Sequence, residues 1–130
     1  MSLEVSIAGL RLRNPVMLAA GILGISAPLL KRVFESGAGA VVTKSIGLKA
    51  REGFPNPTIV EVEGGFVNAM GLPNPGVEEF KSEVSRLKRW GVRVVASVFG
   101  STAGEYAEAA SELCEAGAEA VELNCSCPHV

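Results

Sequence analysis

The sequence contains no long apolar run. None of its 130 residues belongs to a stretch approaching the roughly 18–20 apolar residues that a membrane-spanning helix needs. The first residues show no basic segment followed by an apolar one, so we expect no signal peptide. An excess of basic charge is also missing, because 12 Lys and Arg stand against 14 Asp and Glu. The resulting net charge of −2 gives no support to nucleic-acid binding.

Cysteine and histidine are scarce as well. The three cysteines are odd in number, and two of them, Cys125 and Cys127, are one residue apart. This pattern argues against a disulfide framework and favours a reducing, cytoplasmic setting. The one histidine, His129, lies beside the cysteine pair near the end of the chain.

Apolar residues nevertheless make up 48% of the chain, and their pattern predicts alternating strands and helices. Short apolar runs predict four buried strands, over 16–20, 40–44, 92–98 and 120–124. Helical spacing with capping and stop signals predicts three helices, over 28–36, 75–90 and about 102–116. The expected N-caps are Ser26, Asn74, and either Ser101 or Thr102. We expect Tyr106, Ala110, Leu113 and Cys114 to form the core stripe of the third helix.

Two further segments complete the predicted order. Alternating apolar residues over 3–14 predict a small hairpin before the first strand. A Gly/Pro-rich insertion, 47–75, follows the second strand and contains a hairpin signature at Gly64-Gly65. Alternating strands and helices with apolar strands predict an α/β fold with a parallel sheet, in a single domain over residues 1–130.

Reactive side chains are concentrated just beyond the last predicted strand, in Asn124-Cys125-Ser126-Cys127-Pro128-His129. The earlier strands end near Gly21, Lys44 and Gly100. In parallel βα folds the carboxyl ends of the strands carry the ligand site. We therefore expect Lys44, Asn124 and Cys127 to meet at one rim, with the 47–75 insertion above them. Pro128 biases Cys127 toward an extended backbone, which holds the thiol on a loop.

Several blocks occur together in one order: Ala19-Ala20-Gly21, Thr43-Lys44-Ser45, 61–65, 68–76 and Asn124-Cys125-Ser126-Cys127-Pro128. With them the chain resembles the N-terminal half of a dihydroorotate dehydrogenase catalytic subunit, over nearly its whole length. The 68–76 block is most similar to the soluble class that pairs with a flavin–iron–sulfur subunit and passes electrons to NAD. The resemblance implies half of a flavin-binding (β/α)₈ TIM barrel, with an N-terminal hairpin and a long insertion after the second strand.

The resemblance also implies an activity, the FMN-dependent oxidation of dihydroorotate to orotate in pyrimidine biosynthesis. Cys127 matches the family's general base, which takes a proton from C5 of dihydroorotate. A free thiol has a pKa of about 8.5, and a nearby ammonium such as that of Lys44 would lower it. NAD, FAD and an iron–sulfur cluster would enter only through a partner subunit, and a homo-oligomer is expected.

The remaining roles are carried over position by position. The positions expected to contact FMN are Ala20, Gly21, Lys44, Ser45 and Asn124. The positions expected to contact the substrate are Lys44, Asn68, Met70, Gly71, Leu72, Asn124 and His129. At the position of His129 the family usually has an asparagine, and related pyrimidine-reducing enzymes have a histidine. A related flavoenzyme of that kind is therefore an alternative. Cys125 replaces a more usual aliphatic residue, and we expect it to serve packing.

Three other readings remain open at this point. Cys125, Cys127 and His129 could be soft metal ligands, although a fourth ligand is not evident and we predict no metal. Lys44 could form a Schiff base, which leaves the cysteine loop unexplained. Finally, the 130 residues could be a non-catalytic half barrel, because the flavin phosphate commonly sits on loops after the seventh and eighth strands. The isolated half is therefore expected to be inactive.

Overall fold

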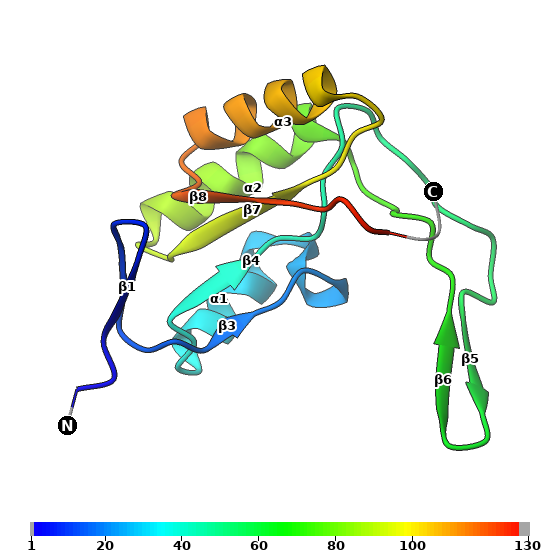
Figure 1. Cartoon of the computed structure of the whole chain (residues 1–130), viewed down its shortest axis with the longest axis horizontal. Helices are drawn as coiled ribbons and strands as arrows, with labels where there is room; N and C mark the ends of the chain where they lie inside the picture. Colours follow the sequence, from blue (N-terminus) through cyan, green and yellow to red (C-terminus); the bar gives the residue numbers. More distant parts are fainter. Residues whose placement is uncertain (1, 128–130) are drawn as a thin grey trace.

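The computed structural model describes residues 2–127 of the chain. Its centre is a four-stranded parallel sheet in the order β3 (Met17–Leu18), β4 (Ala40–Val42), β7 (Val94–Val98) and β8 (Ala120–Leu123) (Figure 1). Each strand lies beside the one before it in this sheet, so the strand order does not reverse. The connecting helices are α1 (Ala27–Glu35), α2 (Val77–Arg89) and α3 (Ala103–Glu115). The predicted α/β fold with a parallel sheet is confirmed.

The core lies between the parallel sheet and the three helices that connect its strands. Phe80, Val84 and Leu87 recur at helical spacing along α2 and are fully buried. They pack in one cluster with Leu30 of α1 and Leu113 of α3. Burying each large apolar side chain contributes about 1.5–3 kcal/mol, so this stripe fixes the helices on the sheet.

The N-cap predicted for α2 is wrong. The helix begins at Val77, and Gly76 before it has φ 84°, so the chain turns between Pro75 and the helix. The Asn74 amide closes the base of the insertion instead. Its Oδ1 accepts from the amides of Gly47 at 3.2 Å and Gly76 at 2.9 Å, while its Nδ2 donates to the Leu72 carbonyl at 3.0 Å.

The N-cap predicted for α3 is confirmed, and the predicted buried face of this helix is confirmed only in part. Thr102 is the N-cap, with its hydroxyl accepting from the Glu105 amide at 3.2 Å. Leu113 is buried, but Cys114 is exposed, so its placement in the core stripe was wrong. The buried face includes Ala109, because the helix is rotated slightly from the predicted stripe.

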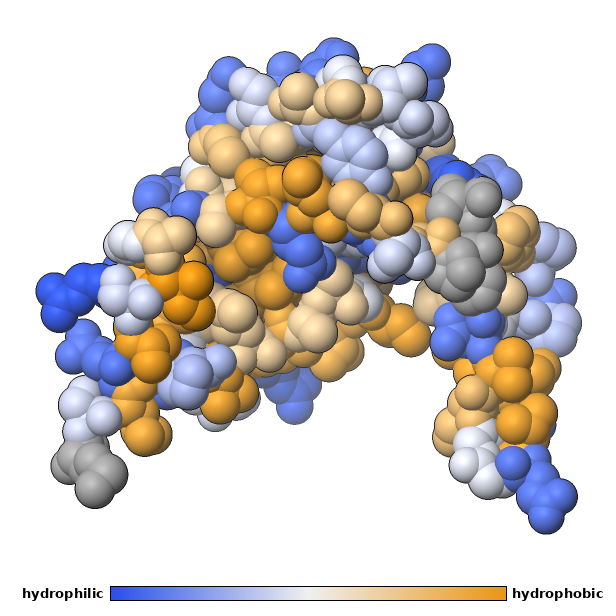
Figure 2. Space-filling view, viewed as in Figure 1, coloured by the Kyte–Doolittle hydropathy of each residue, from blue (hydrophilic) through white to orange (hydrophobic). Residues whose placement is uncertain are grey.

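Two antiparallel pairs flank the sheet. β1 (Val5–Ile7) pairs with β2 (Leu10–Leu12), and β5 (Ile59–Val62) pairs with β6 (Gly65–Asn68). The turn of the second hairpin is Glu63-Gly64, one residue earlier than predicted, and Gly64 has the positive φ that such a turn requires. This hairpin projects away from the sheet, and its apolar side chains form part of the surface (Figures 1 and 2).

A short 3-10 helix, η1 (Ile22–Ile25), follows β3 and had not been predicted. Its Gly24 lies against the chain just after β4, as described below. Within residues 2–127, no helix has the length and apolar character needed to cross a membrane.

We predict that Asn74→Ala destabilises the fold by about 2–4 kcal/mol. The substitution leaves the buried backbone N–H groups of Gly47 and Gly76 without their acceptor. Chemical denaturation measures the change. Ser82→Ala is the matched control, because the Ser82 hydroxyl makes only an exposed bond to the Glu79 carbonyl and its loss should cost less than about 0.5 kcal/mol. Equal stability of the two variants would show that Asn74 does not hold the insertion.

Candidate active site

The chain just after β4 packs directly against Gly24 of η1. The Lys44 amide donates to the Gly24 carbonyl of η1 at 2.9 Å. Gly24 is buried so closely against this segment that a Cβ would lie 2.2 Å from the Lys44 nitrogen. Only glycine allows this approach. β4 ends at Val42, two residues before the predicted end of this strand at Lys44.

A one-residue bulge lies at this contact. The amides of Thr43 and Ile46, three residues apart, donate to the carbonyls of Val95 and Ser97, two residues apart. The β4 side therefore carries one residue more than the β7 side. A bulge re-aims side chains that would otherwise alternate between the two faces of a sheet. As a result, the consecutive residues Lys44 and Ser45 both line one cavity.

Polar side chains form a chain of hydrogen bonds across β4, β7 and β8. The Ser45 and Ser97 hydroxyls are 2.9 Å apart, and Asn124 Nδ2 donates to Ser45 Oγ at 3.0 Å. The Thr43 hydroxyl accepts from the Ser97 amide at 2.9 Å, taking the place of a backbone carbonyl in the ladder. Since Thr43, Ser45 and Ser97 are buried, these bonds satisfy polar groups that water cannot reach. They also hold the side-chain amide of Asn124 in place.

The cysteine segment begins directly after β8. The backbone N–H of Asn124 makes the last hydrogen bond of the ladder between β8 and β7, to the Val98 carbonyl at 2.9 Å. The Asn124 carbonyl accepts from the Tyr106 hydroxyl of α3 at 2.6 Å. Cys127 is half-buried, whereas Cys125 is exposed, so the expectation that Cys125 serves packing was wrong. β8 ends at Leu123, so Cys125 lies beyond the sheet.

A cavity of about 600 Å³ brings the predicted site residues together. It is lined by Ala20, Gly21, Lys44, Ser45, Asn68, Met70, Gly71, Leu72, Asn124 and Cys127. They come from the ends of three strands and from the insertion, as the rim hypothesis expected. The remaining predicted residue, His129, lies outside the described residues.

Sequence reasoning missed several residues at this site. Glu122, Leu123, Cys125 and Ser126 also line the cavity. The signal for Glu122 was present, because it interrupts an apolar strand two residues before Asn124 and so shares its face. A second cavity, of about 370 Å³, also borders the cysteine segment, and Arg51 and Tyr106 line it together with Cys127. No sequence pattern pointed to Arg51 or Tyr106 as neighbours of Cys127.

Lys44 is the charged group buried at the floor of the site. Its side chain is only 8% exposed, and no acidic partner for it lies within salt-bridge distance among residues 2–127. Burial lowers the pKa of the Lys44 ammonium from its usual value, while the charge of nearby Cys127 acts in the opposite direction. The site therefore holds a cation that lacks a full counter-charge, which suits an anionic ligand.

Known proteins similar to this chain belong to one family. The family model described as dihydroorotate dehydrogenase matches residues 2–130. The chain belongs to the dihydroorotate dehydrogenase family. It is 50% identical over 131 residues to the protein named dihydroorotate dehydrogenase B (NAD(+)), catalytic subunit, of Methanocaldococcus jannaschii. It is 51% identical over 127 residues to the protein of the same name from Methanothermobacter thermautotrophicus.

The match to dihydroorotate dehydrogenases covers nearly all of this chain and less than half of its relatives. It spans 98% of this chain in both cases, but 42% and 41% of the relatives' own lengths. A solved structure, of DHODH from Eimeria tenella in complex with ferulenol, superposes with a TM-score of 0.80 at 21% identity. That superposition covers 98% of this chain and 37% of the other, and it shows the shared fold.

The reading of the cysteine segment as a metal centre gains no support from the part of the chain that the structure describes. No group of three or more His, Cys, Asp or Glu residues among 2–127 is arranged to hold a metal ion. The third candidate ligand, His129, lies outside that range.

We predict that Lys44→Met stabilises the ligand-free protein and that the gain depends on pH. Burial holds the Lys44 pKa below its unfolded value of 10.5, so at neutral pH the folded state must keep a disfavoured charge. Between the folded and unfolded pKa values the unfolded state binds more protons, and the native protein gains stability as pH rises. The advantage of Met should therefore be largest at neutral pH and shrink as pH approaches 10.5.

Thermal melts of both proteins across this range test the prediction. Lys49→Met is the matched control, because Lys49 is exposed on the insertion and has no burial penalty to relieve. A Lys44→Met advantage that is absent, or independent of pH, would contradict a buried charge at this position.

Proposed function

We propose that the protein containing this chain oxidises dihydroorotate to orotate with FMN as its cofactor. The observation that carries the proposal is the convergence of Lys44, Asn124, Cys127 and the Met70–Leu72 backbone on one cavity. The set combines a buried cation, an amide and a thiol, and it coincides with the residues that the family resemblance selects. The names of the relatives, with about 50% identity, support the same reaction.

The residues at the cavity fit a flat, partly polar ring such as that of FMN. A Cβ placed on Gly21 would meet no atom within 4 Å, so open space lies beside Ala20 and Gly21. An adjoining cavity of about 570 Å³ adds apolar walls from Ile59 and Phe66 of the hairpin. Lys44, Ser45 and Asn124 supply a polar edge. Bound FMN would supply the acceptor for the hydride.

The chain's own residues would hold the substrate and move its proton. Lys44 would face the substrate carboxylate, and backbone amides from Met70 to Leu72 would donate to it. Gly71 has φ 72°, which keeps this backbone close to Phe54 and leaves no space for a side chain on that side. Asn68 and Asn124 would hydrogen-bond the pyrimidine ring. Cys127 would accept the proton that leaves C5, which general-base catalysis requires.

The four parallel strands are proposed as half of a (β/α)₈ barrel. Support comes from the unreversed strand order and from the relatives, of which this chain spans about two fifths. The relatives' names describe a catalytic subunit that uses NAD(+). We therefore propose a partner subunit that carries electrons from FMN to NAD(+) through FAD and an iron–sulfur cluster.

Cys127→Ser in the complete protein should slow flavin reduction by dihydroorotate about 10²–10⁴-fold, the usual contribution of a general base. Its pH dependence should move upward, because a serine hydroxyl ionises at higher pH than a thiol. Anaerobic stopped-flow bleaching of the flavin absorbance measures both effects. Cys114→Ser controls for loss of a thiol, since Cys114 is exposed on α3 and does not line the cavity. An unchanged rate in Cys127→Ser would remove this residue from the mechanism.

Lys44→Ala should weaken both FMN retention and orotate binding, because one cation serves two anionic partners. Gel filtration followed by an absorbance scan measures retained flavin, and orotate titration of the flavin spectrum measures affinity. Titration with a pyrimidine lacking the carboxylate separates dihydroorotate oxidation from the related pyrimidine-reducing activity. If orotate affinity is unaltered in Lys44→Ala, the lysine is a structural charge.

A further inference from the structure

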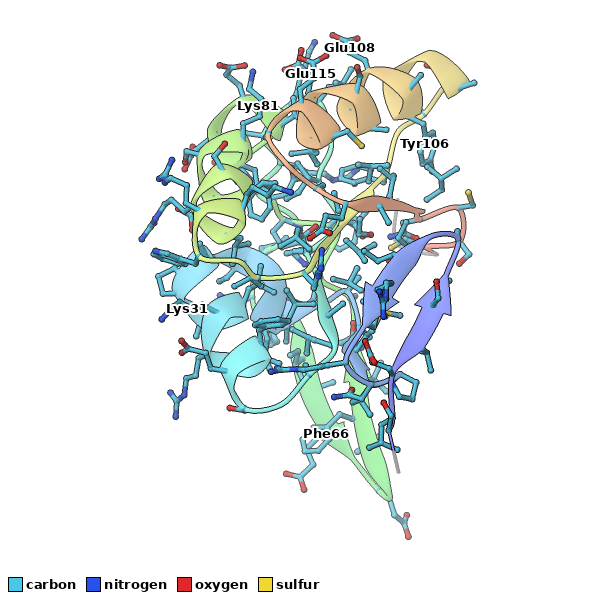
Figure 3. All side chains as sticks on the ribbon, turned by 90° about the vertical axis from the view of Figure 1, so that its left-hand side faces the viewer. Lys31, Phe66, Lys81, Tyr106, Glu108 and Glu115 are labelled. Carbon is cyan, nitrogen blue, oxygen red and sulfur yellow. The ribbon has the colours of Figure 1, made fainter. Side chains whose placement is uncertain are left out.

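Tyr106 is the group outside the predicted site that touches the cysteine segment most directly. It lies on the first turn of α3, and its hydroxyl donates to the Asn124 carbonyl at 2.6 Å, 18 residues along the chain. Figure 3 shows the side chain descending from α3 toward the chain beyond β8. Its ring also lines the second cavity, together with Cys125 and Cys127.

The segment that carries Cys127 has few other anchors. The sheet ladder ends with the bond from the Asn124 amide to the Val98 carbonyl. Within the described chain, residues 125–127 make no backbone–backbone hydrogen bond outside regular elements, and the Ser126 amide reaches Asn124 Oδ1 only at 3.5 Å. The Tyr106 hydroxyl therefore fixes the peptide that joins Asn124 to Cys125, which sets the direction of the segment.

The helix that carries Tyr106 is itself rigidly held. Ala109 and Leu113 of α3 are fully buried, and Thr102 caps the helix. Tyr106 packs against the same core cluster. The Asn124 side chain is held separately, by its bond to Ser45. Loss of the tyrosine hydroxyl would therefore free the main chain that leads from Asn124 to Cys127. The side-chain amide of Asn124 would stay bonded to Ser45.

We propose that Tyr106 is a positioning residue for Cys127, which aligns the thiol by holding the Asn124 carbonyl with its hydroxyl. The inference rests on the proposed function, because it gives Tyr106 a role in the reaction only through the Cys127 base. A tyrosine serves this purpose better than phenylalanine, because the ring alone would pack on α3 without fixing the peptide plane.

The test is Tyr106→Phe in the complete, flavin-loaded protein. We expect flavin reduction by dihydroorotate to slow about 10–100-fold, since a ~1 Å misplacement of a reacting group can cost about 100-fold. Orotate affinity and melting temperature should change little. Ser85→Ala is the matched control, because the Ser85 hydroxyl also donates to a backbone carbonyl, that of Ala116 at 3.2 Å, between two helices. It should leave the rate unchanged.

A double-mutant cycle separates positioning from a structural effect. Tyr106→Phe should have no further effect in a Cys127→Ser background, because the thiol that it aligns is already absent. Independent slowing in both backgrounds would overturn the proposal, as would a wild-type rate in Tyr106→Phe or loss of its fold. If Cys127→Ser alone reduces flavin at the wild-type rate, the proposed general base fails instead, and the two failures are thereby distinguished.

Discussion

The contact between Gly24 and the chain after β4 is the constraint on which the site depends. The Gly24 carbonyl of η1 accepts from the Lys44 amide at 2.9 Å, and at this point the β4 side carries one residue more than the β7 side. Two consecutive side chains then line the same cavity, which a regular strand would not permit. A side chain on Gly24 would collide with the backbone of Thr43 and Lys44 and displace the segment that carries the site residues.

Buried hydroxyl groups on the sheet are a second constraint on the site. Thr43, Ser97 and Ser45 are buried and bonded in sequence, and Asn124 completes the chain at the rim. Such fully satisfied polar networks specify one arrangement, because any displacement strands a buried donor or acceptor. Asn124 is consequently fixed at both ends, by Ser45 through its side chain and by Tyr106 through its carbonyl.

Lys44 illustrates how stability and binding oppose one another here. Burial disfavours its ammonium and lowers its pKa, and the described residues provide no salt-bridge partner. The same incomplete neutralisation leaves the cation available to an anionic ligand. A more stable fold would place an apolar residue at this position and would lose the charge on which ligand binding is proposed to rest.

The sequence by itself determined the α/β class, the four strands and three helices, and most of the cavity lining. The class and the elements follow from local periodicity, and the meeting of Lys44, Asn124 and Cys127 follows from the rule that parallel strands present their carboxyl ends at one edge. The other lining residues were predicted from the family resemblance. The tertiary structure alone decided the start of α2, the bulge at Lys44, the exposure of Cys114 and the role of Asn74. Two of them involve a partner distant in sequence, Gly24 for Lys44 and Gly47 for Asn74. Tyr106 is the clearest case, because helical spacing placed it in a core stripe, whereas only the folded chain brings its hydroxyl to the Asn124 carbonyl.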